Sequence, residues 1–182
     1  LQAIIGAYEE VLLLDPEHER AKGQITLIYA ERLGQLEDAL DGENLAEAEF
    51  LIEELSKKIP ENNRLEVLST RFQTRLQVGR ILKSTSLLMD ANGLDDELIV
   101  AAATQSLQEV LRLDPKNTEA LASLSQISEL YSRKSMEASN EGRLDEAIQF
   151  LERASLANPL NKNLDSARAL VAKAEPEQGT IK

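Results

Sequence analysis

Few side chains in this chain of 182 residues have the type and spacing that catalysis or metal binding requires. Its one histidine, His18, stands between two glutamates just after Pro16, which is typical of an exposed first helical turn rather than of a general base. The sequence contains no cysteine, which excludes disulfides, thiolate nucleophiles and cysteine-ligated zinc. The eight glycines are scattered and form no phosphate-binding loop. We therefore expect no enzymatic activity and no cofactor.

One acidic segment, residues 90–97, has a weak likeness to a calcium-binding loop. Its glycine, Gly93, is the fourth residue of the segment, whereas a calcium loop needs glycine at the sixth position. A turn followed by an acidic helix start accounts for the same residues, because carboxylates are favoured at a helix N-terminus. The sequence therefore predicts no metal site, and a metal-responsive module is the alternative that calorimetry with calcium would test.

The charge of the chain argues against nucleic acid as a partner. Asp and Glu number 32 against 20 Lys and Arg, so the net charge is −12 and repels phosphate backbones. Aromatic residues, which would stack on bases, are only 3% of the chain. No stretch approaches about 18 consecutive apolar residues, so we expect no direct membrane insertion. Cytoplasm and periplasm are both compatible with a cysteine-free chain, and the localisation stays open.

Regularly spaced prolines indicate the elements that must position any binding residues. Four of the five prolines in the chain are separated from one another by 44, 55 and 44 residues. They are Pro16, Pro60, Pro115 and Pro159. Because proline lacks an amide donor and clashes with the preceding helical turn, each one marks a junction between helices.

A glycine lies between each pair of successive prolines, and we expect it to close a helix in the left-handed conformation. These glycines are Gly42, Gly93 and Gly142. Apolar residues recur in steps of three, four and seven, as in Leu144, Ala147, Leu151 and Ala154, and so form one face of a helix. The predicted fold class is all-α, with each proline-to-proline unit forming an antiparallel helical hairpin.

The last unit resembles a known repeat family. Gly142, Ala147, Ala154 and Pro159 have the spacing of the second helix of a tetratricopeptide repeat, in which small side chains lie where helices cross. The resemblance extends more weakly over residues 1–174 and implies a right-handed α-solenoid of antiparallel hairpins. The units are longer than the usual 34 or so residues, so HEAT-type repeats of about 40–47 residues are the structural alternative.

The predicted domain organisation is one repeat domain over residues 1–174, followed by a polar tail at 175–182. The domain is divided into a helix at 1–14, hairpins at 17–58, 61–113 and 116–157, and a capping helix at 161–174 with Leu164, Ala167 and Val171 inward. The chain opens inside a helical pattern, so we expect it to be a piece of a longer protein. The bare apolar face of the first helix would be covered by upstream sequence or by a second copy, giving a homodimer.

Families of this kind bind extended peptides or partner helices. The resemblance therefore implies a non-catalytic scaffold for protein–protein interaction, with a peptide or protein partner. The alternative is a regulatory or sensory appendage of a larger membrane-anchored or catalytic protein, in which the chain could mediate dimerisation.

One candidate contact is a basic ridge. Arg64, Arg71 and Arg75 share a helix face and follow an acidic stretch at residues 37–54. The arginines either recognise a partner of opposite charge or pair with acidic residues of a neighbouring helix, which is common among exposed charges.

A second candidate contact is the tip of the 55-residue unit, whose extra length falls in both helices and should project beyond the stack. Leu87, Leu88, Met89 and Leu94 lie near this tip. They either form an uncovered apolar patch for a partner or are buried between the two helices of the hairpin.

Overall fold

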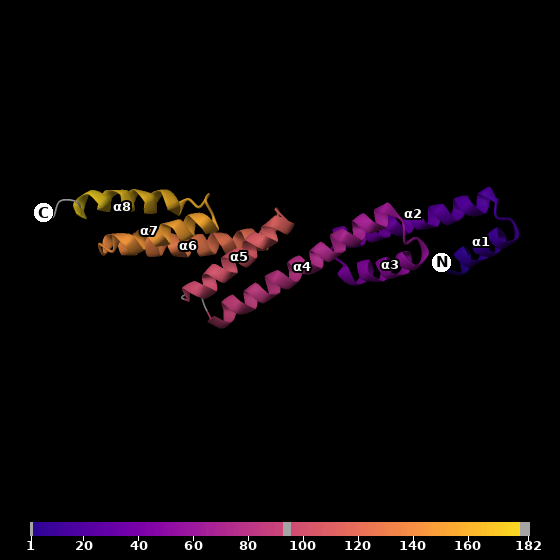
Figure 1. Cartoon of the computed structure of the whole chain (residues 1–182), viewed down its shortest axis with the longest axis horizontal. Coiled ribbons are helices and arrows are strands. Elements are labelled where there is room, and N and C mark those ends of the chain that lie inside the picture. Colours follow the sequence, from indigo (N-terminus) through magenta and orange to yellow (C-terminus); the bar gives the residue numbers. More distant parts are fainter. Residues whose placement is uncertain (1, 93–95, 179–182) are drawn as a thin grey trace. The chain divides into compact units, whose positions relative to one another are not determined.

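The computed structural model describes residues 2–92 and 96–178, and its regular structure is helical throughout these ranges (Figure 1). The helices are α1 (Gln2–Leu14), α2 (Glu19–Asp41), α3 (Leu45–Lys58), α4 (Asn63–Asn92), α5 (Glu97–Leu113), α6 (Thr118–Asn140), α7 (Leu144–Ala157) and α8 (Asn163–Gln178). The described ranges contain no strand, so the predicted all-α fold class is confirmed. Most helices adjacent in sequence pack against each other, namely α1 with α2, α2 with α3, α5 with α6, α6 with α7 and α7 with α8, which is consistent with a helical-repeat solenoid.

The chain divides into two compact units, residues 1–76 and 77–182, with the boundary inside α4. Unit 1 contains α1, α2, α3 and the first part of α4, and α2 packs against both α1 and α3. Its core joins apolar side chains of three helices: Leu33, Leu36, Ala39, Leu40, Ala48, Leu51, Leu55, Leu65, Leu68 and Phe72. Burial of this continuous face is what stabilises the unit.

Unit 2 contains the remainder of α4 together with α5, α6, α7 and α8, and α6 packs against the three helices that surround it. Its main core comprises Val78, Val100, Leu107, Val110, Ala120, Leu124, Ile127, Tyr131, Ala154, Ala157 and Leu164. A smaller cluster of Ala138, Ala147 and Val171 joins α8 to the α6–α7 hairpin. The inward positions predicted for the last helix, Leu164, Ala167 and Val171, are all buried.

The prolines lie in the four helix junctions as predicted, and each junction is built alike. In each turn the residue two positions after proline donates its N–H to the carbonyl of the residue before proline, at 3.0 to 3.2 Å. Proline thus occupies the second position of a four-residue turn, where its fixed φ is favourable. The donor residue then caps the next helix: Asn62 and Asn117 accept from backbone N–H groups at 3.0 Å, and His18 does so through Nδ1 at 3.2 Å. His18 is therefore the N-cap of α2.

The glycine turns differ from the prediction at one position. Gly142 has a φ of 76° and is left-handed as expected. Gly42, in contrast, has a φ of −81°, and the left-handed residue of that turn is Glu43, with a φ of 57°. The prediction for Gly42 was wrong because glycine permits the left-handed conformation without requiring it. Gly93 lies outside the described residues.

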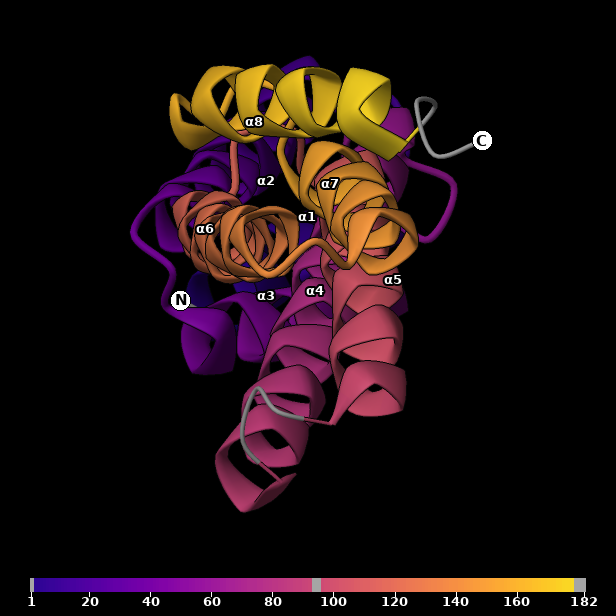
Figure 2. The same ribbon diagram turned by 90° about the vertical axis from the view of Figure 1, so that its left-hand side faces the viewer.

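The middle hairpin is longer than its neighbours in both helices, as the proline spacing predicted. Its helices α4 and α5 have 30 and 17 residues, against 23 and 14 in the α2–α3 and α6–α7 hairpins. Within unit 2, Figure 2 shows the loop end of the α4–α5 hairpin extending past α6, α7 and α8. At the C-terminal end, α8 continues to Gln178, four residues beyond the predicted end of the capping helix, through Glu175 and Glu177, which are good helix formers, and Pro176, which is not.

Candidate partner-binding surfaces

The basic ridge lies on the first part of α4 and is paired within unit 1. Each arginine bonds to a carboxylate at or just after the C-terminal end of α2: Arg64 to Glu37 at 2.5 Å, Arg71 to Asp41, and Arg75 to Glu43 at 3.4 Å. The arginine side chains are a third to a half exposed, so each pair stabilises the fold only weakly. The three arginines therefore neutralise three carboxylates of the acidic stretch, and a contact of the ridge with a partner stays a prediction.

The residues near the hairpin tip have unequal environments. Leu87 is 61% exposed, whereas Met89 packs against the core of unit 2. Leu88 is half-buried, and Leu94 lies outside the described residues. Met89 is thus partly covered by the core of unit 2, whereas Leu87 and the 82% exposed Leu98 lie at the surface.

Met89 also borders a pocket of about 160 Å³ between α4, α5 and α6 in unit 2. The pocket is lined by Leu82, Thr85, Ser86, Met89, Asp90, Leu107, Glu119, Ser123 and Gln126. Its two charged residues, Asp90 and Glu119, are both acidic, and within the described ranges neither has a basic partner within 4.0 Å. We call this feature the α4–α6 groove. It combines an apolar floor with hydroxyl groups and an unbalanced negative charge.

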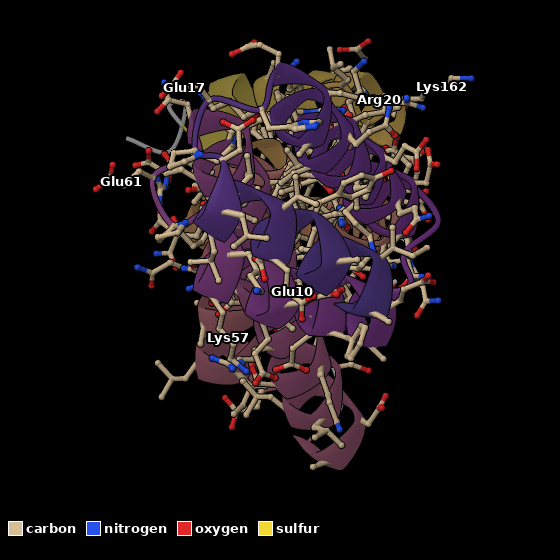
Figure 3. All side chains as sticks on the ribbon, turned by 90° about the vertical axis from the view of Figure 1, so that its right-hand side faces the viewer. Glu10, Glu17, Arg20, Lys57, Glu61 and Lys162 are labelled. Carbon is tan, nitrogen blue, oxygen red and sulfur yellow. The ribbon has the colours of Figure 1, made fainter. Side chains whose placement is uncertain are left out.

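A larger pocket of about 410 Å³ lies in unit 1 between α1, α2 and α3. It is lined by Ile5, Tyr29, Arg32, Phe50, Glu53, Glu54, Leu55, Lys57 and Lys58. Burial raises the pKa of the Tyr29 phenol, and a hydrogen bond to Glu9 raises the pKa of Lys58. Lys57 lies at the outer side of α3 and is seen at the surface with Glu10 of α1 (Figure 3). We call this feature the α1–α3 pocket.

The residues of the repeat signature meet in the α6–α7 hairpin. Ala147 and Ala154 of α7 are fully buried, and each one's backbone carbonyl accepts a hydrogen bond of 2.7 Å from a serine of α6, Ser135 and Ser128 respectively. Such bonds need small side chains on both helices, because a larger group would hold the backbones apart. Gly142 closes the turn between the helices, and Pro159 lies in the turn after them.

A family comparison matches this same hairpin. The family model of the tetratricopeptide repeat matches residues 128–159, which span the C-terminal half of α6 and all of α7. Residues 128–159 are therefore similar to a tetratricopeptide repeat, and the helical hairpins of the described residues fit a tetratricopeptide-like repeat protein. No curated protein and no solved structure matches it.

Tetratricopeptide repeats generally mediate protein–protein interaction, and proteins of this family are typically non-catalytic scaffolds. The one histidine has a structural role as a helix cap. Within residues 2–92 and 96–178, no group of three or more acidic or histidine side chains is placed to hold a metal ion. In the same ranges, no helix combines the length and the apolar character that crossing a membrane demands.

Residue patterns alone did not identify the α1–α3 pocket. Its lining residues come from three helices, and none of them forms a motif in the sequence. One signal was present: aligning the α2–α3 hairpin with the α6–α7 hairpin, 99 residues later, places Arg32 opposite Tyr131 and Glu54 opposite Arg153. In unit 2, Tyr131 is buried and Arg153 lies over its ring, so unit 1 has different side chains at two positions that contact each other in unit 2.

Proposed function

We propose that this protein is a non-catalytic scaffold that binds a peptide or a partner protein through the surfaces of its helical repeats. The α4–α6 groove supports this proposal best, because it lies between the first helices of two successive hairpins. Polypeptide binding needs an apolar pocket for an anchor residue and polar groups that orient it. The apolar pocket is formed by Leu82, Met89 and Leu107, and the polar groups are the hydroxyl and carboxylate groups around them.

The charge of the groove indicates the kind of peptide it would take. Asp90 and Glu119 are both exposed at its edge, and the chain as a whole has a net charge of −12. A basic side chain beside an apolar residue complements this arrangement, since opposite charges steer association and fix the register of the bound segment. The expected ligand is therefore a segment in which Lys or Arg adjoins an apolar residue.

Panning a library of random peptides displayed on phage against the protein tests this function. We expect enrichment of peptides with Lys or Arg beside an apolar residue. The Asp90→Asn/Glu119→Gln variant should bind a selected peptide about tenfold more weakly, equivalent to about 1.4 kcal/mol. The matched control is Asp145→Asn/Glu152→Gln, which removes two exposed carboxylates from α7 outside the groove.

Equal affinities of the two double variants, or the absence of any enriched peptide, would contradict the proposed function. Isothermal titration calorimetry of one selected peptide with each variant supplies the affinities, and circular dichroism confirms that both variants stay helical.

A homodimer through α1 is a second proposal. Three apolar side chains of this helix are more than half exposed, Ile4, Leu13 and Leu14, the last at 90%. Exposed apolar residues gathered on one element favour contact with another surface. Sedimentation equilibrium of the protein and of its Leu13→Ser/Leu14→Ser variant tests this proposal, because only the unaltered protein should dimerise. The regulatory appendage of a larger protein stays a prediction.

A further inference from the structure

The α1–α3 pocket of unit 1 has features of an anchor site that are independent of the α4–α6 groove. Its floor is apolar, since Ile5 and Leu55 are only 4% and 1% exposed. At its rim Phe50 is 62% exposed and extends the apolar surface outward. A volume of about 410 Å³ is within the usual range for ligand pockets, roughly 300–1,000 Å³.

The charged groups around the pocket are already balanced. Each pairs with an opposite charge: Lys57 with Glu53 at 2.8 Å, Lys58 with Glu9 at 3.0 Å, and Arg32 with Glu54 at 3.6 Å. Among the described residues, each charge that lines the pocket thus has an opposite charge within 4.0 Å, although the buried Arg32 Nε and Glu54 Oε2 make no hydrogen bond. The occupant that complements this pocket electrostatically is therefore neutral overall.

The equivalent position in unit 2 indicates what kind of neutral group is suitable. There, Tyr131 takes the place of Arg32 and is only 3% exposed. The guanidinium of Arg153, which takes the place of Glu54, lies 5.7 Å from the centre of the Tyr131 ring and 5.8 Å from that of Phe150. The α6–α7 hairpin thus places aromatic rings against a guanidinium, an attractive arrangement because the ring face is negative.

Unit 1 has a guanidinium at this position, that of Arg32, but the ring corresponding to Tyr131 is missing. Arg32 projects from α2 among the pocket residues, and 23% of its side chain is exposed. Tyr29, one turn earlier on the same helix, and Phe50 on α3 add aromatic surface to the walls. The pocket therefore has the cation and the apolar walls of the unit 2 arrangement, and it lacks a ring stacked on the cation.

We propose that the α1–α3 pocket receives an aromatic side chain of a partner polypeptide, which packs against the Arg32 guanidinium and the Phe50 ring. Aromatic anchors in desolvated pockets dominate the affinity of many protein interfaces. The exposed Phe50 provides surface for the residues next to the anchor, so a peptide gains contacts that an isolated aromatic molecule does not.

The probe for this proposal is the capped pentapeptide Ac-Ala-Ala-Trp-Ala-Ala-NH2, followed by two-dimensional NMR of the isotope-labelled protein. We expect shifts confined to residues that line the pocket, including the Nε–H of Arg32. The same peptide with Lys in place of Trp should bind at least about fivefold more weakly, because the pocket offers no unpaired carboxylate. Ac-Trp-NH2 alone should also bind more weakly than the pentapeptide.

Two variants test the role of the pocket itself. Arg32→Tyr/Glu54→Arg transfers the Tyr131–Arg153 arrangement into unit 1, fills the pocket, and should abolish the Trp-dependent shifts. Gln73→Lys, at an exposed position of α4, makes the same net change of one positive charge and should bind normally. Phe50→Ala alters only a largely exposed side chain, so it should leave the fold intact and weaken binding at least about threefold.

Several results would overturn the proposal: no shifts at the pocket with the Trp peptide, equal binding of the Trp and Lys peptides, or unchanged binding by Phe50→Ala. Equal affinity for Ac-Trp-NH2 and the pentapeptide would instead assign the pocket to a small aromatic ligand. Because Asp90 and Glu119 lie outside this pocket, failure here leaves the proposed function of the α4–α6 groove untouched.

Discussion

The α2–α3 and α6–α7 hairpins have the same dimensions but are held together differently. In both, the first helix has 23 residues and the second has 14, and the turns between them have the same pattern of backbone hydrogen bonds. The inner face of the first helix differs completely, however. Leu33, Leu36 and Leu40 of α2 are replaced 99 residues later by Ser132, Ser135 and Ser139 of α6, and all six side chains are buried.

This exchange alters how closely the paired helices meet. The hydroxyl of Ser135, like that of Ser128 two turns earlier on α6, donates to a backbone carbonyl of α7, which requires close approach. The leucines of α2 instead pack in one cluster with Leu51 and Leu55 of α3. Close packing of small groups and interlocking of large ones can both fill a helix interface to normal density. The family match covers the α6–α7 hairpin because small residues at Ala147 and Ala154 belong to the family pattern, and Leu55 in α3 departs from it.

The largest expected effect comes from truncating a leucine of the first hairpin. Leu36→Ala should lower the free energy of unfolding by about 2–5 kcal/mol, because it leaves a cavity at a fully buried position. The equivalent change in the second hairpin, Ser135→Ala, should cost only about 1 kcal/mol, the usual net value of one hydrogen bond. Urea denaturation of both variants measures the difference, and equal losses would mean that the two interfaces are not held differently.

The reverse exchange tests whether α6 and α7 need small side chains. Ser135→Leu gives α6 the residue of α2 and should destabilise the protein by about 1–3 kcal/mol, since the added methyl groups overpack a close interface. Ser155→Leu, at a half-buried position of α7 outside that interface core, is the control and should cost less. A Ser135→Leu variant as stable as the unaltered protein would show that the interface has room to spare.

The two turns offer a smaller contrast. Gly142→Ala should cost about 1–2 kcal/mol, because a Cβ is disfavoured at a φ of 76°. Glu43→Gly removes the same kind of strain in the other turn, but adds chain entropy to the unfolded state and loses the Arg75 ion pair. We expect its net effect to stay within about 0.5 kcal/mol. Denaturant midpoints of the two variants provide the measurement. A large loss of stability in Glu43→Gly would mean that the Arg75–Glu43 ion pair contributes strongly to the fold.

The smallest effect is the pH dependence that Tyr131 contributes in unit 2. Burial raises the pKa of Tyr131 above its ordinary value of 10.0, so the unfolded chain ionises this phenol first as the pH rises. Stability from this residue is therefore complete below pH 10 and falls as the pH increases through the raised pKa. Thermal melts of Tyr131→Phe should show a shallower decline above pH 10. An identical decline in both proteins would mean that Tyr131 ionises alike in the folded and unfolded chain.

Much of the fold could be predicted from the sequence because its signals are local. Proline ends a helix by its own covalent geometry, so Pro16, Pro60, Pro115 and Pro159 reported the junctions directly. Apolar spacing reported which helix faces are buried, including Leu164 and the positions that follow it. The conformation of the turn at Gly42 was not predicted, because it depends on how α2 and α3 pack against each other. In that turn Glu43, and not Gly42, has the left-handed backbone conformation.

The surfaces were less predictable because they are assembled from several helices. The arginine ridge was visible as a pattern, but only the packing of α2 beside α4 showed that each arginine already has a carboxylate partner. The α1–α3 pocket had no pattern of its own, since Ile5, Arg32 and Phe50 belong to three different helices.

The sequence by itself determined the helical hairpins, their lengths and the order in which they follow one another, because proline geometry and apolar periodicity act within a few residues. Only the tertiary structure decided which charges are neutralised and where cavities stay open. Both depend on side chains distant in sequence, whose distances are set by how closely each pair of helices can approach.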